Sequence, residues 1–76
     1  MTVTVHMHGN LRRFLPGGQD RAQVEVAPGT TVEDLLASLD ATRDTWLVAV
    51  NGVAVERTRG LSPGDLVECF EAVAAG

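Results

Sequence analysis

The side chains best suited to chemistry in this sequence are two histidines near its start. His6 and His8 stand two residues apart, and side chains at that spacing share one face of a β-strand. Two imidazoles can bind a transition-metal ion, but no third ligand follows close by in the sequence. The pattern therefore favours two histidines on a solvated sheet face, and an enzyme or metal site around them is the weaker hypothesis.

The single cysteine, Cys69, limits the chemistry further. One thiol excludes an internal disulfide and any zinc site that needs two thiolates, and it is compatible with a reducing cytoplasm. Cys69 has the same strand parity as Val67, so we expect a buried and inert thiol. No nucleophile–histidine–acid set is convincing, and Pro16-Gly17-Gly18 lacks the Gly-Lys-Ser/Thr that a phosphate-binding loop requires.

Length and charge exclude several classes of function. The chain has 76 residues and a net charge of -4, and all six of its basic residues are arginine. One small domain is expected, and its limited core disfavours a self-contained catalytic cavity. A nucleic-acid binder usually carries the opposite charge balance. The apolar run 46–50 is too short to cross a bilayer, and the first residues do not form a signal peptide. We therefore expect a cytoplasmic domain that binds neither nucleic acid nor membrane.

The elements that must position these residues are mostly strands. Alternating or continuous apolar residues predict five of them, over 2–8, 23–26, 46–50, 53–55 and 66–70. Asn51-Gly52 predicts a hairpin turn between the third and fourth. Residues 11–15 form a loop or a single helical turn. Trp46 is expected in the core or at its edge.

One helix is predicted after Gly29. Thr30 with Glu33, and Thr31 with Asp34, stand at capping-box spacing. An apolar stripe follows at Val32, Leu35, Leu36 and Leu39 and predicts a helix of about ten residues. One helix covers one face of a sheet, and a crossover through it allows the strands before and after it to lie parallel. We expect an α+β fold with a four- to five-stranded mixed sheet.

Four stretches of the sequence, taken in order, resemble the MoaD/ThiS family of sulfur carriers. They are Leu11-Arg12-Arg13-Phe14-Leu15, residues 28–36 (Pro-Gly-Thr-Thr-Val-Glu-Asp-Leu-Leu), Val50-Asn51-Gly52, and Leu61 with Pro63-Gly64-Asp65, Val67 and Phe70 leading to Ala74-Ala75-Gly76. The long first loop is more similar to the molybdopterin synthase small subunit than to the thiamine branch. The resemblance implies one ubiquitin-like β-grasp domain over residues 1–76, with 71–76 as a flexible C-terminal tail.

The resemblance also implies a function. In this family a partner enzyme adenylates the C-terminal carboxylate, here that of Gly76, with ATP and magnesium. Sulfur then replaces AMP, and the thiocarboxylate donates sulfur in cofactor biosynthesis. Molybdopterin or tungstopterin is the first expectation, and thiamine or another sulfur metabolite is the second. Such a chain is a protein cosubstrate without a tightly bound cofactor. Its partners would be a ubiquitin-activating-like adenylating enzyme and the molybdopterin synthase large subunit, or another sulfur-accepting enzyme.

The residues expected to contact these partners lie in the tail, the last strand and the first loop; they are Phe70, Val73, Ala74, Ala75, Arg12 and Arg13. Without the resemblance, Phe70 could equally well cover the edge of the sheet. Arg12 and Arg13 are then more typical of an ordinary solvated loop. Two departures from the family pattern matter. Ala75-Gly76 replaces the usual Gly-Gly, and Glu71-Ala72 stands where relatives often have Pro-Pro. Both favour the alternative of a non-carrier ubiquitin-like binding module whose tail is not activated.

Overall fold

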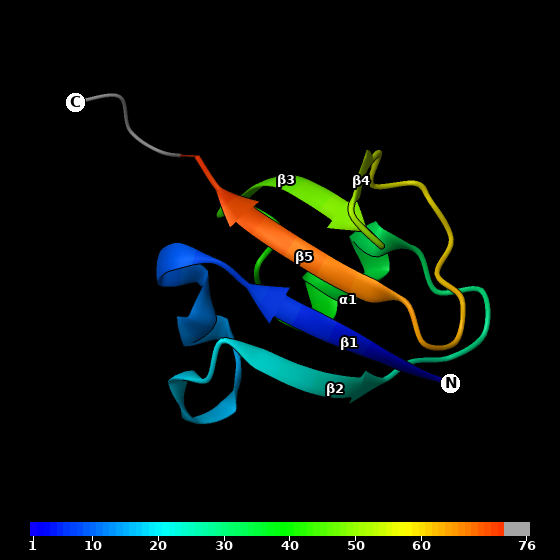
Figure 1. Ribbon diagram of the computed structural model, residues 1–76, viewed down its shortest axis with the longest axis horizontal. Coiled ribbons are helices and arrows are strands. Elements are labelled where there is room, and N and C mark those ends of the chain that lie inside the picture. Colours follow the sequence, from blue (N-terminus) through cyan, green and yellow to red (C-terminus); the bar gives the residue numbers. More distant parts are fainter. Residues whose placement is uncertain (73–76) are drawn as a thin grey trace.

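The computed structural model describes residues 1–72 and contains one five-stranded sheet (Figure 1). The elements in chain order are β1 (Thr2–Met7), the 3-10 helices η1 (Gly9–Phe14) and η2 (Pro16–Gly18), β2 (Arg21–Glu25), α1 (Val32–Ser38), β3 (Thr45–Val50), β4 (Val53–Val55) and β5 (Leu66–Glu71). The strand order across the sheet is β2-β1-β5-β3-β4. Neither α1 nor the 3-10 helices within residues 1–72 have the length and apolar character needed to cross a membrane.

The two central strands, β1 and β5, come from opposite ends of the sequence and run parallel. The other neighbouring pairs are antiparallel: β1 with β2, β3 with β4, and β3 with β5. Asn51 and Gly52 both adopt positive φ, at 52° and 85°, and turn the chain from β3 into β4 as the Asn-Gly pair predicts. The expected α+β fold with a mixed sheet on one main helix is confirmed.

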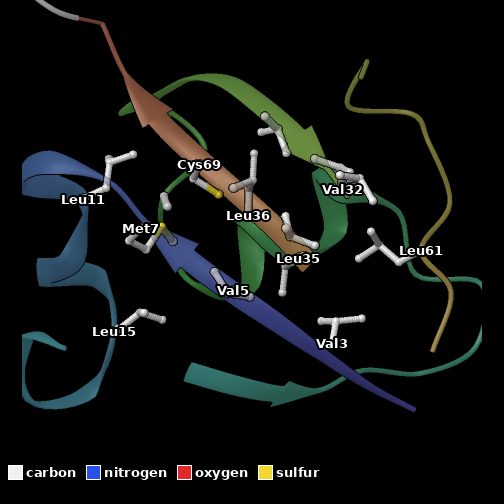
Figure 2. Close-up of a cluster of buried hydrophobic side chains, with 14 residues drawn as sticks. Val3, Val5, Met7, Leu11, Leu15, Val32, Leu35, Leu36, Leu61 and Cys69 are labelled. Atoms are coloured by element: carbon white, nitrogen blue, oxygen red, sulfur yellow. The ribbon is translucent and has the colours of Figure 1, made fainter. Parts of the chain in front are cut away.

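The core lies between one face of the sheet and α1 (Figure 2). Strict alternation puts Val3, Val5 and Met7 of β1 on this face, and all three have 1% exposure or less. Leu35 and Leu36 reach them from α1, and both are fully buried. This face of the sheet is therefore occupied, and the opposite face is the one left for binding.

Cys69 points into this core from β5, as its strand parity predicts. Burial raises the pKa of its thiol to about 11, against a small lowering effect from the positive charge of Arg57. A thiol with so high a pKa is almost fully protonated at neutral pH and is a poor nucleophile. The expected burial of Cys69 is confirmed. Its raised pKa supports the expectation that the thiol is inert.

The helix α1 begins as expected but ends early. Thr31 forms the capping box with Asp34: the Asp34 amide donates to the Thr31 hydroxyl, and the Thr31 amide donates to the Asp34 carboxylate. The helix ends at Ser38 after seven residues, so the expectation of about ten was wrong. Asp40 stops it by adopting a left-handed conformation, with φ at 58°.

The third strand contains an irregularity that changes one expectation. Thr45 pairs with Glu71 and Leu47 with Phe70, so Trp46 is an extra residue in β3 opposite two adjacent residues of β5. Such a bulge breaks the alternation of side chains. Trp46 is consequently 68% exposed, and its expected place in the core was wrong.

Candidate functional site

The candidate site is the face of the sheet that α1 leaves uncovered. Figure 1 looks onto this face, with α1 behind β1 and β5. The two central strands bring their outward-facing residues together in a parallel register that pairs His6 with Glu68. One step further along, the ring of His8 stacks on Phe70, with centroids 4.3 Å apart and planes 11° from parallel. Histidine, carboxylate and aromatic side chains thus form a row along the middle of the open face.

An apolar surface lies beside the end of β5. It consists of Phe70, its cross-strand partner Leu47, and the neighbouring Trp46, and we call these three residues the Phe70 patch. Leu47 is 37% exposed, Trp46 is 68% exposed, and Phe70 is partly buried. Exposed aromatic and aliphatic side chains of this kind favour contact with another protein. Phe70 lies on a central strand and not at the edge of the sheet, and its role in docking stays a prediction.

The first loop is fixed against the end of β5 by backbone contacts. The amide of His8 donates to the Cys69 carbonyl at 3.0 Å, and the amide of Asn10 donates to Oε1 of Glu71 at 3.0 Å. Gly9 makes this close approach possible, because its φ is 62° and a Cβ there would run into the Glu71 carboxylate. The start of helix η1 is therefore held against the end of β5.

The two arginines of η1 differ in their surroundings. Arg13 is half-exposed: it pairs with Asp44 at 3.4 Å, donates to the Asn10 carbonyl at 2.8 Å and lies 4.5 Å from the centre of the Phe14 ring. Arg12 is exposed and has no acidic partner among residues 1–72. The guanidinium of Arg12 is thus available to an acidic group on a partner, whereas that of Arg13 is already engaged.

The remaining predicted site residues, Val73, Ala74, Ala75 and Gly76, lie outside the described residues. Their roles stay predictions. Glu71 belongs to β5, so the strand runs one residue further than the sequence pattern indicates.

Sequence reasoning missed two features of the open face, the proximity of Glu68 to the histidines and the exposure of Trp46. Glu68 is the third potential metal ligand beside His6 and His8, and it comes from a strand 60 residues away from His8. Only the parallel pairing of β1 with β5 brings it there. Trp46 was missed as an exposed residue because a bulge leaves no mark in an apolar run.

Comparisons with known proteins place the chain in a family. The sequence model of the ThiS family matches residues 5–76. No curated protein sequence matches the chain significantly.

Solved structures with the same fold have low sequence identity. The putative molybdopterin converting factor subunit 1 from Pyrococcus furiosus has a TM-score of 0.79 at 24% identity, over 96% of this chain and 99% of that one. Small archaeal modifier protein 1 from Haloferax volcanii has a TM-score of 0.77 at 21% identity, over 95% and 98%. A complex of subunits 1 and 2 of molybdopterin-converting factor from Helicobacter pylori contains a chain with a TM-score of 0.65 at 18% identity, over the full length of both. These likenesses establish the β-grasp fold.

Proposed function

The chain belongs to the ThiS family of small ubiquitin-like sulfur carriers, and we propose that it carries sulfur on the carboxylate of Gly76. The observation that carries the proposal is the family match, which extends through residue 76. The open sheet face with the Phe70 patch supports it, because a carrier has to dock on other proteins while it delivers its tail.

The proposed chemistry takes place in a partner enzyme. The Gly76 carboxylate attacks the α-phosphorus of ATP, pyrophosphate leaves, and an acyl adenylate forms. Sulfide then attacks the acyl carbon, the C–O bond to AMP breaks, and a thiocarboxylate remains. Magnesium and ATP belong to the partner, and this chain supplies the acyl group and the docking surface. It acts as a cosubstrate, with the catalytic residues in the adenylating enzyme.

The length of the tail is compatible with a reaction that takes place in the active site of a partner. Residues 72–76, which follow the last residue of β5, would span about 17 Å in an extended conformation, at roughly 3.3 Å per residue. That length allows the Phe70 patch to dock on the surface of a partner while the terminal carboxylate enters its active site. Val73, Ala74 and Ala75 have small or medium side chains that suit a narrow channel.

We assign the sulfur to molybdopterin or tungstopterin synthesis first. The long loop between β1 and β2 and the two molybdopterin-converting structural neighbours support this choice over thiamine or another sulfur metabolite. The Helicobacter pylori structure is titled as a complex of subunits 1 and 2. By analogy, the proposed acceptor is a large subunit that receives the tail of this chain.

Mass spectrometry of the tail tests the proposal. The protein is incubated with ATP, magnesium, a sulfur source and a soluble extract of its own cells, and is then cleaved after Arg59. The resulting peptide, residues 60–76, contains no methionine, so methionine oxidation cannot imitate the replacement of oxygen by sulfur. A Cys69→Ala variant removes the one remaining sulfur atom that could be modified.

The expected result is a mass gain equal to the exchange of one oxygen for sulfur in this peptide, absent when Gly76 is deleted. Ala75→Gly is the positive comparison, because Ala75 adds a methyl group next to the reacting carboxylate. We expect the natural protein to react, since alanine can still lie extended, but more slowly than the Ala75→Gly variant.

The alternative is a ubiquitin-like binding module whose tail is never activated. The Ala75-Gly76 ending and the absence of Pro-Pro after Phe70 favour it. An unchanged peptide mass in both the natural protein and the Ala75→Gly variant, in an extract that converts a Gly-Gly relative, would replace the carrier by this alternative. If only Ala75→Gly is converted, the natural tail is inactive because of Ala75.

A further inference from the structure

The open face also contains a cluster of metal-binding side chains that sulfur transfer does not use. His6 and His8 of β1 and Glu68 of β5 each direct one donor atom into the same small volume, with all three atoms within 4.8 Å of one another. We propose that these residues form a binding site for a divalent transition-metal ion, with Zn²⁺ as the preferred occupant.

The distances suit a tetrahedral ion. Oε2 of Glu68 lies 3.0 Å from Nε2 of His8 and 3.7 Å from Nδ1 of His6. Zinc binds imidazole nitrogen and carboxylate oxygen at about 2.0–2.2 Å, which puts neighbouring ligand atoms of a tetrahedron roughly 3.3 Å apart. These two separations lie on either side of this value. The 3.0 Å contact is a hydrogen bond in the metal-free protein, so Nε2 of His8 gives up its proton and the side chains rotate when an ion binds.

The contacts of His6 already favour the tautomer that a metal needs. Its Nδ1 accepts from the Arg21 guanidinium at 3.3 Å, and a guanidinium can only donate, so this nitrogen carries a lone pair. Its Nε2 lies 3.8 Å from Oδ2 of Asp20. A carboxylate on the far nitrogen of a ligating imidazole orients the ring and strengthens its bond to the metal. At 3.8 Å this carboxylate is too far for a hydrogen bond, so Asp20 acts as a positioning residue only once it moves closer to the ring.

The site is accessible and keeps an open position. The side chains of His6, His8 and Glu68 are 18%, 33% and 22% exposed, so an ion reaches them without unfolding. His6, His8 and Asp20, but not Glu68, also line a hollow of about 420 Å³, which gives an ion access to the two imidazoles. Three protein ligands with a fourth position left to water is an arrangement that zinc adopts. Two imidazoles and one carboxylate also suit zinc better than magnesium or calcium, which prefer oxygen ligands.

One positive charge opposes the ion. Arg21 occupies the lone pair of His6 and has to move when a metal binds. It lies on the exposed side of the edge strand β2, where its side chain has room to move. Removing this guanidinium should strengthen metal binding, whereas removing any of the three ligands should weaken it. Opposite effects at neighbouring positions separate ligation from a general disturbance of the sheet.

The test uses untagged protein and metal ions alone, without any partner enzyme. Co²⁺ is titrated and followed by its visible absorption, which is intense for tetrahedral and weak for octahedral coordination, and Zn²⁺ is then added to displace it. We expect one ion per chain and a binding constant at least about tenfold weaker in His6→Ala, His8→Ala and Glu68→Gln. Glu33→Gln, an exposed acid on α1, should bind as the natural protein does. Arg21→Ala should bind more tightly.

A second readout covers variants that fold poorly. In the natural protein, Zn²⁺ should shift the amide NMR signals of His6, His8 and Glu68 and raise Tm by about 5 °C at saturation. Binding that is unchanged in both His8→Ala and Glu68→Gln, or the absence of any shift at these three residues, would overturn the proposal. Because neither measurement involves ATP or the tail, failure of the metal site and failure of the carrier function are distinguishable.

Discussion

Asp65 joins two turns that the fold depends on. Its carboxylate accepts from the Ser62 amide at 2.8 Å and from the Asn51 side chain at 2.9 Å, and it lies 3.4 Å from the Arg59 guanidinium. Asn51 in turn accepts from the Leu66 amide at 2.9 Å. The hairpin turn between β3 and β4 is thereby tied to the turn that precedes β5, and Asp65 is only 6% exposed.

Replacing this carboxylate should be costly. We expect Asp65→Asn to lower the free energy of unfolding by about 1–3 kcal/mol, because the amide group turns a donor toward groups that themselves donate. Urea denaturation followed by circular dichroism measures the loss. Asp44→Asn, which removes only a surface ion pair with Arg13, should change stability by about 0.5 kcal/mol or less.

The loss of stability in Asp65→Asn should depend on pH. The hydrogen bond from the Ser62 amide, and those from Asn51 and Arg59, lower the pKa of Asp65 against the opposing effect of burial. A lowered pKa in the folded state stabilises the protein above the unfolded value of about 3.9, and this stabilisation disappears as the pH falls through the folded pKa. The difference in the free energy of unfolding between the natural protein and Asp65→Asn should be largest at pH 7 and should shrink toward pH 2. A constant difference over this range would contradict the assignment.

At the scale of single residues, the sequence predicts which side chains are buried better than it predicts which side chains contact one another. The parity of Cys69 with Val67 identified a buried thiol correctly, because alternation along one strand decides which face a residue occupies. The third ligand beside His6 and His8 could not be predicted in this way. Glu68 reaches them only through the pairing of two strands from opposite ends of the chain, and no local pattern encodes that pairing.

At the scale of elements, the end of α1 is the best place to improve the protein. The amide of Asp40 donates to the Ala37 carbonyl, and the amide of Ala41 donates to the Leu36 carbonyl, as in a Schellman motif. This motif needs a left-handed residue, usually glycine, and here Asp40 occupies the position with φ at 58°. Its negative charge also lies at the negative end of the helix.

We therefore expect Asp40→Gly to raise the free energy of unfolding by about 0.5–1 kcal/mol. Asp40→Ala removes the same charge but keeps a Cβ in the left-handed conformation, and it should be less stable than Asp40→Gly. The two midpoints in urea separate the conformational effect from the electrostatic one. If Asp40→Ala is as stable as Asp40→Gly, the charge alone accounts for the gain.

Four of the strands were predicted to within one residue at each end, whereas β2 begins two residues earlier than expected and the helix is shorter than expected. Alternation of apolar residues identified β1 and β5 because each buries one face. The apolar stripe of α1 continues to Leu39, which packs partly against the core although it lies beyond the last helical residue. A stripe records which residues touch the core, whereas the backbone conformation of Asp40 decides where the helix stops.

At the scale of the whole molecule, the layering separates stability from binding. The fully buried side chains of residues 1–72 lie between α1, the first loop and one face of the sheet. The Phe70 patch lies on the outward side of β3 and β5, so its residues can change without opening the core. A variant on this patch should therefore affect partner binding far more than it affects folding.

Leu47→Asp tests this separation. The variant puts a charge at the centre of the Phe70 patch, beside Phe70, and a charge is costly where a partner removes water. We expect affinity for the proposed adenylating enzyme to fall by about tenfold or more with little change in Tm. Val53→Asp is the matched control, because Val53 is 65% exposed and pairs with Val50 at the other end of β3.

Trp46 allows the binding to be observed directly. It is the only tryptophan of the chain and lies next to Leu47, so fluorotryptophan incorporation gives one ¹⁹F signal from the patch itself. Titration with the proposed adenylating enzyme should shift this signal in the natural protein and in Val53→Asp, but only at about tenfold higher concentration in Leu47→Asp. If all three proteins bind equally while the Trp46 signal stays fixed, the partner docks elsewhere, and the tail alone has to account for recognition.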